Sequence, residues 1–214
     1  MRRHILLLPL LFLGLWGSAQ DSWTLKTNKE GIAVYMKSAD NSKLKVIRVI
    51  CTLTATPSQL VSVILDVNTG ADWVYSTKSS VLLKKVSPSE LYYYSEVSVP
   101  WPVNNRDFVS HLIVTQDPSS KVVTINGPTI PDYLPAKDGI VRVGANSSGK
   151  WVITAKQPQQ ILVEYTLQVD PAGSLPAWLV NLFAAKGPFE TFKNLKEQLK
   201  KPAYANAKFP FIVE

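Results

Sequence analysis

Strand patterns follow one another through residues 81–169 of this chain, with no helical pattern between them. In the last pattern every second residue from Ile161 to Val169 is apolar, while Glu164 points the other way, which is typical of a strand with one buried face. Turn-forming pairs such as Asn104-Asn105 separate the segments. The expected strands are 81–86, 91–99, 108–115, 122–126, 140–144, 151–155 and 161–169. Consecutive strands without intervening helices predict an antiparallel meander.

The chain before this region carries a hairpin pattern and a helical pattern. Alternating apolar residues in 43–54 predict a strand, which we expect to pair with 31–38. Pro57 then opens a run with apolar residues at helical spacing, and a short second helix is expected around 68–75. The sheet is therefore interrupted once, near its beginning.

The C-terminal part has the pattern of one long amphipathic helix. Apolar residues recur at helical spacing through 175–199, with a predicted kink at Pro188. Such a helix needs an apolar surface to cover, and the sheet offers one. The predicted fold class is therefore α+β, with an antiparallel sheet and a long C-terminal helix.

The first residues have the pattern of a secretory signal. Arg2-Arg3 precede an apolar run over 5–16, followed by small residues up to Ala19. The run is roughly a dozen residues long, whereas a membrane-spanning helix needs about twenty. We expect cleavage of residues 1–19 and export to the periplasm or the medium, the alternative being a retained N-terminal anchor. Residues 20–214 are then one domain.

Size and charge limit the classes of partner. A chain of 214 residues with 46% apolar residues can bury one substantial core. The formal net charge is +7, but the lysines are spread rather than massed, so a nucleic-acid groove is not predicted. The charge favours either transient contact with an anionic membrane surface or solubility alone. We expect a monomer.

The residue types that carry most enzyme chemistry are scarce. Cys51 is the only cysteine, and it lies among alternating apolar residues, so a buried side chain is expected. His111 is the only histidine after the predicted signal, which leaves no ligand set for a histidine or cysteine metal site. A Cys51–His111 nucleophile and base pair is the remaining formal arrangement, and no local pattern exposes either residue. We expect no cofactor, no metal and no enzymatic activity.

Three stretches resemble the START family, the steroidogenic-acute-regulatory-related lipid-transfer domains. They are PWPVNNRDFV at 100–109, LPAKDGIVR at 134–142 and VDPAGSLPAWLVN at 169–181. Together with the order of elements, the resemblance covers nearly the whole chain after the signal. It implies a helix-grip fold, in which a curved antiparallel sheet wraps a long C-terminal helix around an internal apolar cavity.

One position departs from the pattern of some sterol-binding members. These carry a second arginine six residues after the arginine of the Arg-Asp-Phe motif, reported as part of a buried charged pair, and Leu112 stands there in this chain. Glu96, in the preceding predicted strand, is a candidate partner for Arg106 instead. Arg106 is expected to be structural or to orient the ligand, and a sterol specificity is not carried over.

The resemblance and the residues together predict non-enzymatic binding of a single lipid or other apolar molecule, and leave open its transfer between membranes. The residues expected at the cavity are Glu96, Trp101, Arg106, Tyr133, Trp178, Leu182, Phe189 and Phe192. One alternative is a helix-grip enzyme of the cyclase or hydrolase type, for which Glu96, Asp107 and His111 are candidate ionisable groups. Another is a protein-interaction module.

Overall fold

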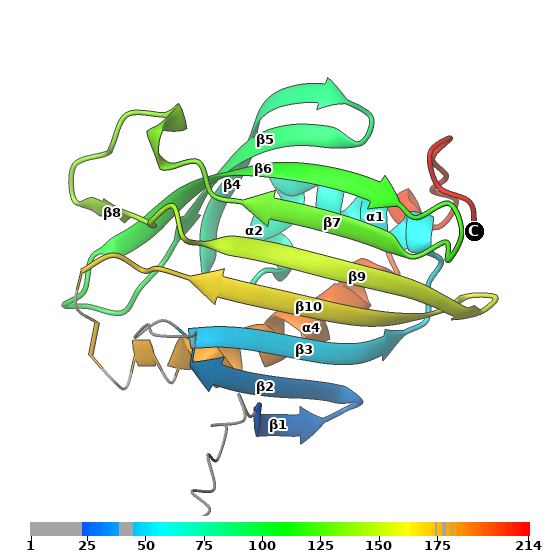
Figure 1. Cartoon of the computed structure of the whole chain (residues 1–214). Coiled ribbons are helices and arrows are strands. Elements are labelled where there is room, and N and C mark those ends of the chain that lie inside the picture. The colour runs from blue at the N-terminus through cyan, green and yellow to red at the C-terminus, as the bar shows by residue number, and fades with distance from the viewer. Residues whose placement is uncertain (1–22, 39–44, 174, 177–178, 181) are drawn as a thin grey trace, which may run out of the picture.

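The computed structural model describes residues 23–38, 45–173, 175–176, 179–180 and 182–214 (Figure 1). A large curved antiparallel sheet dominates it. The strands are β1 Thr24–Lys29, β2 Ile32–Ser38, β3 Lys45–Leu53, β4 Thr77–Ser87, β5 Glu90–Val97, β6 Asn105–Gln116, β7 Val123–Pro128, β8 Ile140–Arg142, β9 Ser148–Gln157 and β10 Gln160–Val169.

The strands follow the order β1-β2-β3-β10-β9-β7-β6-β5-β4. Each neighbouring pair along this path is antiparallel, which confirms the meander. The pairing of β3 with β10 joins the N-terminal strands to the end of the meander. One segment differs from the prediction: β8 pairs with β6 in parallel, with Asp107 opposite Arg142.

The first helical segment follows its sequence signals closely. Helix α1, Pro57–Leu65, begins with a capping box in which the Thr56 hydroxyl accepts from the Gln59 backbone and the Gln59 side chain accepts from the Thr56 backbone. A short 3₁₀ turn, η1 Val67–Thr69, and helix α2, Gly70–Trp73, lead into β4. Further 3₁₀ turns are η2, Pro131–Tyr133, and η4, Pro202–Tyr204.

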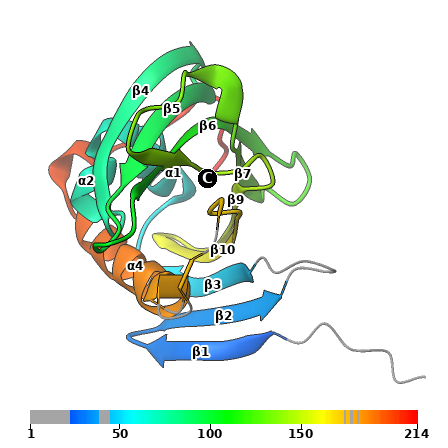
Figure 2. The ribbon, with the colours of Figure 1, turned by 90° about the vertical axis from the view of Figure 1, so that its left-hand side faces the viewer.

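The C-terminal helix differs in detail from the predicted one. Residues Leu182–Lys186 form a π-helical turn, η3, and α4 then spans Gly187–Gln198 with Pro188 in its first turn. The proline therefore begins the α-helix, where its missing N–H costs nothing. Helix α4 lies along the inner side of the curved sheet (Figure 2). Its Phe192 and Leu195 side chains are completely buried in the core.

The buried core confirms the expectation for Cys51, which is 1% exposed between the sheet and α4. Burial raises the pKa of its thiol. In the part of the chain that the structure describes, no helix is long and apolar enough to cross a membrane. The predicted signal, residues 1–19, lies outside the described residues.

Candidate ligand-binding cavity

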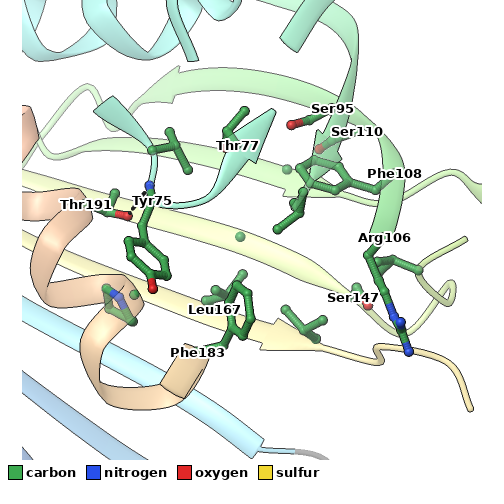
Figure 3. Close-up of a pocket in the computed structure, with 18 of the residues that line it drawn as sticks. Tyr75, Thr77, Ser95, Arg106, Phe108, Ser110, Ser147, Leu167, Phe183 and Thr191 are labelled. Carbon is green, nitrogen blue, oxygen red and sulfur yellow. Dashed lines mark hydrogen bonds between the residues drawn. The ribbon is translucent and has the colours of Figure 1, made fainter. Parts of the chain in front are cut away.

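A cavity of about 660 Å³ lies between the inner face of the sheet and the C-terminal helical segment. Its volume is within the usual range for small-molecule sites. Figure 3 shows side chains from opposite walls, with Tyr75, Phe183 and Thr191 on one side and Phe108 and Ser110 on the other. The cavity predicted from the family resemblance is therefore present.

Aromatic rings form one wall of the cavity. The Trp151 ring packs on Tyr165 with centroids 4.2 Å apart and on Phe192 with centroids 5.4 Å apart. All three residues line the cavity, and Phe192 comes from α4. These contacts join β9, β10 and the helix into one rigid apolar surface.

The charged residues at the cavity are engaged with the protein itself. The three guanidinium nitrogens of Arg106 donate to the backbone carbonyls of Asn104, Pro171 and Ala172 at 2.6–3.4 Å. The Asp66 carboxylate accepts from the Tyr204 hydroxyl at 2.9 Å. Burial lowers the pKa of Arg106, yet these carbonyls compensate for the lost water.

Lys45 and Asp170 are also engaged. The Lys45 amine donates to the Ser38 hydroxyl at 2.9 Å, and the Asp170 carboxylate accepts from the Ala172 backbone N–H at 3.1 Å. With Arg106 and Asp66, these are the charged side chains among the described lining residues. Each of them has a partner before any ligand enters.

Two facing glycines in the sheet wall leave room for neighbouring side chains. Gly127 in β7 is paired with Gly149 in β9. A Cβ on Gly127 would lie 2.8 Å from Leu112 and 3.2 Å from the Ser110 hydroxyl, and one on Gly149 would lie 3.2 Å from the Tyr165 hydroxyl. Glycine in a strand often marks such a close approach.

Two tyrosines line the cavity with their hydroxyls protonated at neutral pH. Burial raises the pKa of Tyr93 to about 12, against a smaller opposing effect of the Ser110 hydrogen bond. Burial also raises the pKa of Tyr165 well above its usual range. Both phenols are therefore neutral groups that can donate a hydrogen bond.

Two of the predicted site residues, Arg106 and Phe192, line the cavity. Trp178 lies outside the described residues. Leu182 and Phe189 do not line it, although Phe189 packs on the core. The π-helical turn shifts the angular spacing of side chains, so that Phe183 faces the cavity in place of Leu182.

The remaining three predicted residues lie elsewhere. Trp101 is 90% exposed in the β5–β6 connection. Tyr133 is 38% exposed and stacks on Tyr92 at 4.8 Å. Glu96 is buried but does not line the cavity, because alternation along β5 turns Ser95 and Val97 inward and Glu96 outward.

The predicted pairing of Glu96 with Arg106 is wrong. The Glu96 carboxylate accepts from Lys78 and from Asn105, both at 2.8 Å. These hydrogen bonds, that from Lys78 first, lower the pKa of Glu96. Arg106 instead lies on the cavity side of the sheet, where Figure 3 shows it among the lining residues, and it donates to backbone carbonyls.

The other two candidates for enzyme chemistry also lie away from the cavity. Asp107 is 1% exposed and binds Arg142. His111 contacts Glu90 at 2.7 Å and stacks on Tyr92 at 4.1 Å. Among the described residues, no three histidine, cysteine, aspartate or glutamate side chains are grouped as a metal site requires.

Sequence reasoning missed the serines, tyrosines and glycines of the cavity wall. Glycines at residues 127 and 149, next to predicted strands, were the available signal for a close approach, but they also suited turns. No comparable signal was present in the sequence for Ser95 and Ser110, because a serine on a strand is usually assigned to the solvent face.

Comparison with known proteins agrees with this architecture. The START domain profile matches residues 11–204 of the chain. A STAR-related lipid transfer protein from Xanthomonas axonopodis is 34% identical, and its solved structure aligns with a TM-score of 0.76 over 85% of this chain and 100% of that one.

Two curated relatives extend the comparison. An uncharacterized protein of Pseudomonas aeruginosa is 29% identical over 203 residues, 93% of this chain and 99% of its own. The phosphatidylcholine transfer protein of Mus musculus is 27% identical over 183 residues, 83% of this chain and 82% of its own. The fold, the cavity and the profile match together show that this chain belongs to the START domain family, whose members include lipid-transfer proteins.

Proposed function

We propose that the protein binds one apolar molecule in the cavity and releases it unchanged, as a carrier rather than an enzyme. The observation that carries this proposal is the cavity of about 660 Å³, with its aromatic wall and its internally paired charges. Moving apolar surface from water into such a space is favourable by about 25 cal/mol per Å². A lipid chain would be held without a covalent step.

The test is native mass spectrometry of the purified chain after incubation with a total lipid extract of a bacterial host. The expected result is a one-to-one noncovalent complex with an apolar molecule. The Gly149→Val variant, which places a side chain in the cavity, should lose most of this complex. A chain that retains no apolar molecule in either form would overturn the proposal.

The enzymatic alternative needs an ionisable group that faces the ligand. Glu96, Asp107 and His111 were the candidates, and none of them lines the cavity. The charged side chains that do line it are each bound to other groups of the protein, namely Lys45, Asp66, Arg106 and Asp170. This supports a carrier. Recovering the bound molecule after prolonged incubation and comparing its mass with the starting material checks the point, since turnover would change that mass.

We further propose that residues 1–19 direct export and are then removed. The basis is the charge pattern and the short apolar run described above. Cell fractionation with N-terminal sequencing should find the chain outside the cytoplasm, beginning near Gln20. A Leu8→Arg variant should stay inside, and wild-type chains that keep these residues in the membrane would contradict the idea.

Contact with membranes and the monomeric state complete the proposal. The formal net charge is +7, and +5 once Arg2 and Arg3 are removed with residues 1–19, which favours encounter with anionic vesicles. Lipid pick-up from vesicles with phosphatidylglycerol should therefore be faster than from neutral vesicles, and salt should remove the difference. Sedimentation at several concentrations should give a single monomer mass.

A further inference from the structure

We infer that a second, smaller pocket of this protein binds a free amino acid with an apolar side chain. The second pocket has a volume of about 260 Å³ and lies between the end of α1, the turn η1, the β4–β5 hairpin and the C-terminal tail. The described lining residues that it shares with the main cavity are Asp66 and Val67. Its occupant is therefore a separate matter from the carrier function.

Apolar side chains form most of the wall of the second pocket. They come from four segments of the chain and are Leu65, Val67, Leu82, Pro88, Leu91 and Phe209. Leu65, Leu82 and Phe209 are partly buried and pack against the core. The volume is below the range of about 300–1,000 Å³ that is usual for drug-sized ligands. The pocket therefore suits a small molecule or a single side chain.

A bulge in β4 turns Lys85 into the second pocket. The register of β4 with β5 shifts between Leu82 and Lys84, so that Leu83 is an extra residue. In a regular strand Leu82 and Lys85 would lie on opposite faces, but the extra residue brings both to the pocket wall. Among the described residues, none forms an ion pair or a hydrogen bond with the Lys85 amine. The pocket therefore has an unpaired cation.

Asp66 brings the opposite charge to the same pocket. Its Oδ2 atom accepts from the Tyr204 hydroxyl at 2.9 Å, and the Gln198 side chain donates to that hydroxyl at 3.0 Å. A phenol holds the carboxylate in place but carries no charge to offset it. No cation of the described part of the chain forms an ion pair with Asp66. One cation and one anion thus line a small pocket without neutralising each other.

Asn68 adds a neutral donor to the second pocket. Its side-chain oxygen accepts from the Leu82 backbone N–H at 2.9 Å, which fixes the orientation of the amide. The amide nitrogen keeps its protons for a ligand, since no described acceptor takes them. Together with the Lys85 amine it can bind a carboxylate. The Oδ1 atom of Asp66 can bind an ammonium group.

A free amino acid carries both complementary groups on one carbon atom, and an apolar side chain matches the wall. A simple fatty acid or amine would pair with only one of the two charges. Lys85 is exposed, so a single ion pair there contributes little. Recognition therefore needs both charges together with the apolar wall. An added strand of a partner protein is disfavoured, because the register of β4 shifts at three positions along this edge.

Three probes that share the leucine side chain test the assignment. They are L-leucine, 4-methylpentanoate, which lacks the ammonium group, and 3-methylbutan-1-amine, which lacks the carboxylate. In methyl NMR of the full chain, Leu65, Leu82 and Leu91 report on the second pocket, and Leu112 and Leu167 report on the main cavity. We expect leucine to shift the first set and to bind about fivefold more tightly than either analogue. Dodecan-1-ol, an apolar probe of the main cavity, should not change this affinity.

The variants Lys85→Met and Asp66→Asn each remove one charge. An asparagine oxygen can still accept from the Tyr204 hydroxyl, so the fold should be kept. Each variant should weaken leucine binding about fivefold. Lys85→Met should leave the affinity for 3-methylbutan-1-amine unchanged, which a merely structural effect would not do. Lys84→Met is the matched control, since Lys84 is exposed and lines neither pocket.

Several results would overturn the amino-acid assignment. They are equal affinities of the three probes, no leucine-induced shift of Leu65, Leu82 and Leu91, and unchanged leucine affinity in both Lys85→Met and Asp66→Asn. N-acetyl-leucine amide, in which both charges are blocked, should bind more weakly than leucine. If it binds more tightly, the second pocket takes an apolar side chain of a protein partner instead. None of these results alters lipid binding in the main cavity, so the carrier function is judged separately.

Discussion

Arg142 donates two hydrogen bonds to the Asp107 carboxylate, with Nε 2.6 Å from Oδ1 and Nη2 3.1 Å from Oδ2. The two residues are register partners in the parallel β6–β8 pair. They come from two of the stretches that carry the family resemblance, 100–109 and 134–142. This buried pair therefore anchors the connection between β7 and β9 to strand β6.

Removing one member of the pair should be strongly destabilising. We expect Asp107→Ala to lower the free energy of unfolding by about 3–5 kcal/mol, because it leaves the largely buried Arg142 guanidinium with no opposite charge, held only by the backbone carbonyls of Pro131, Leu134 and Pro135. Urea denaturation measures the effect, with the exposed Asp138→Ala as control. Arg142→Ala should lower the free energy of unfolding much less in the Asp107→Ala background than it does in the wild type. Simple additivity of the two changes would contradict the coupling.

Arg106 is predicted to act on stability rather than on the ligand. It ties the turn at Asn104 to the segment at Pro171 and Ala172 through backbone carbonyls. Arg106→Ala should lower the free energy of unfolding by about 1.5–3 kcal/mol, the range for a hydrogen bond to a charged group. Dodecan-1-ol affinity, measured below the melting temperature, should stay the same. A lost affinity with intact stability would assign Arg106 to the ligand instead.

Filling the space above the glycine pair should impair binding. Gly149→Val places its side chain against the Tyr165 hydroxyl, which already lies 3.2 Å from the Cβ position. Overpacking typically costs about 1–3 kcal/mol, and it acts on the free protein because Tyr165 is already in place. Binding should weaken in addition, because Gly149 lines the cavity and the valine side chain takes room from the ligand. Lys150→Val is the control, because the neighbouring side chain is exposed and does not line the cavity. Titration with dodecan-1-ol compares the two variants, and equal affinities would place the ligand elsewhere.

Glu96 should give the protein a dependence of stability on acid pH. Its folded pKa lies below the ordinary value of 4.5, owing first to the Lys78 hydrogen bond and then to that from Asn105. In the unfolded chain this carboxyl takes up its proton at a higher pH than in the folded protein. The contribution of Glu96 to the free energy of unfolding is therefore complete above about pH 4.5 and is lost as pH falls through the folded pKa. The free energy of unfolding, measured by urea denaturation between about pH 3 and 6, should fall less steeply with decreasing pH for Glu96→Gln than for the wild type.

The control for that series is Glu197→Gln. Glu197 pairs with Lys200 on the surface, with both side chains about 70% exposed, and such pairs contribute little. Its slope should match that of the wild type. Identical slopes for the wild type and Glu96→Gln would show that the buried hydrogen bonds of Glu96 do not favour its charged form.

Local patterns accounted for most of the secondary structure. The alternation over 161–169 predicted β10, and Pro57 with its capping residues predicted α1, because both signals depend on neighbours along the chain. The family resemblance added the helix-grip arrangement and the cavity. The π-helical turn before Pro188 was not predicted, since its hydrogen-bond spacing leaves no distinct apolar period.

The sequence by itself determined the strands, the first helix and the buried Cys51, because alternation and capping act within a few residues. Only the tertiary structure decided which face of β5 is the inner one. One face of that strand carries Leu91, Tyr93, Ser95 and Val97, and the other carries Tyr92, Tyr94 and Glu96. Both faces mix aromatic with polar residues and both are partly buried, so alternation alone does not show which one meets the cavity. Pairing of β5 with β4 and β6 turned Tyr93 and Ser95 to the cavity and Glu96 to Lys78. The ligand site depends on that choice, because a strand places alternate side chains on opposite sides of the sheet.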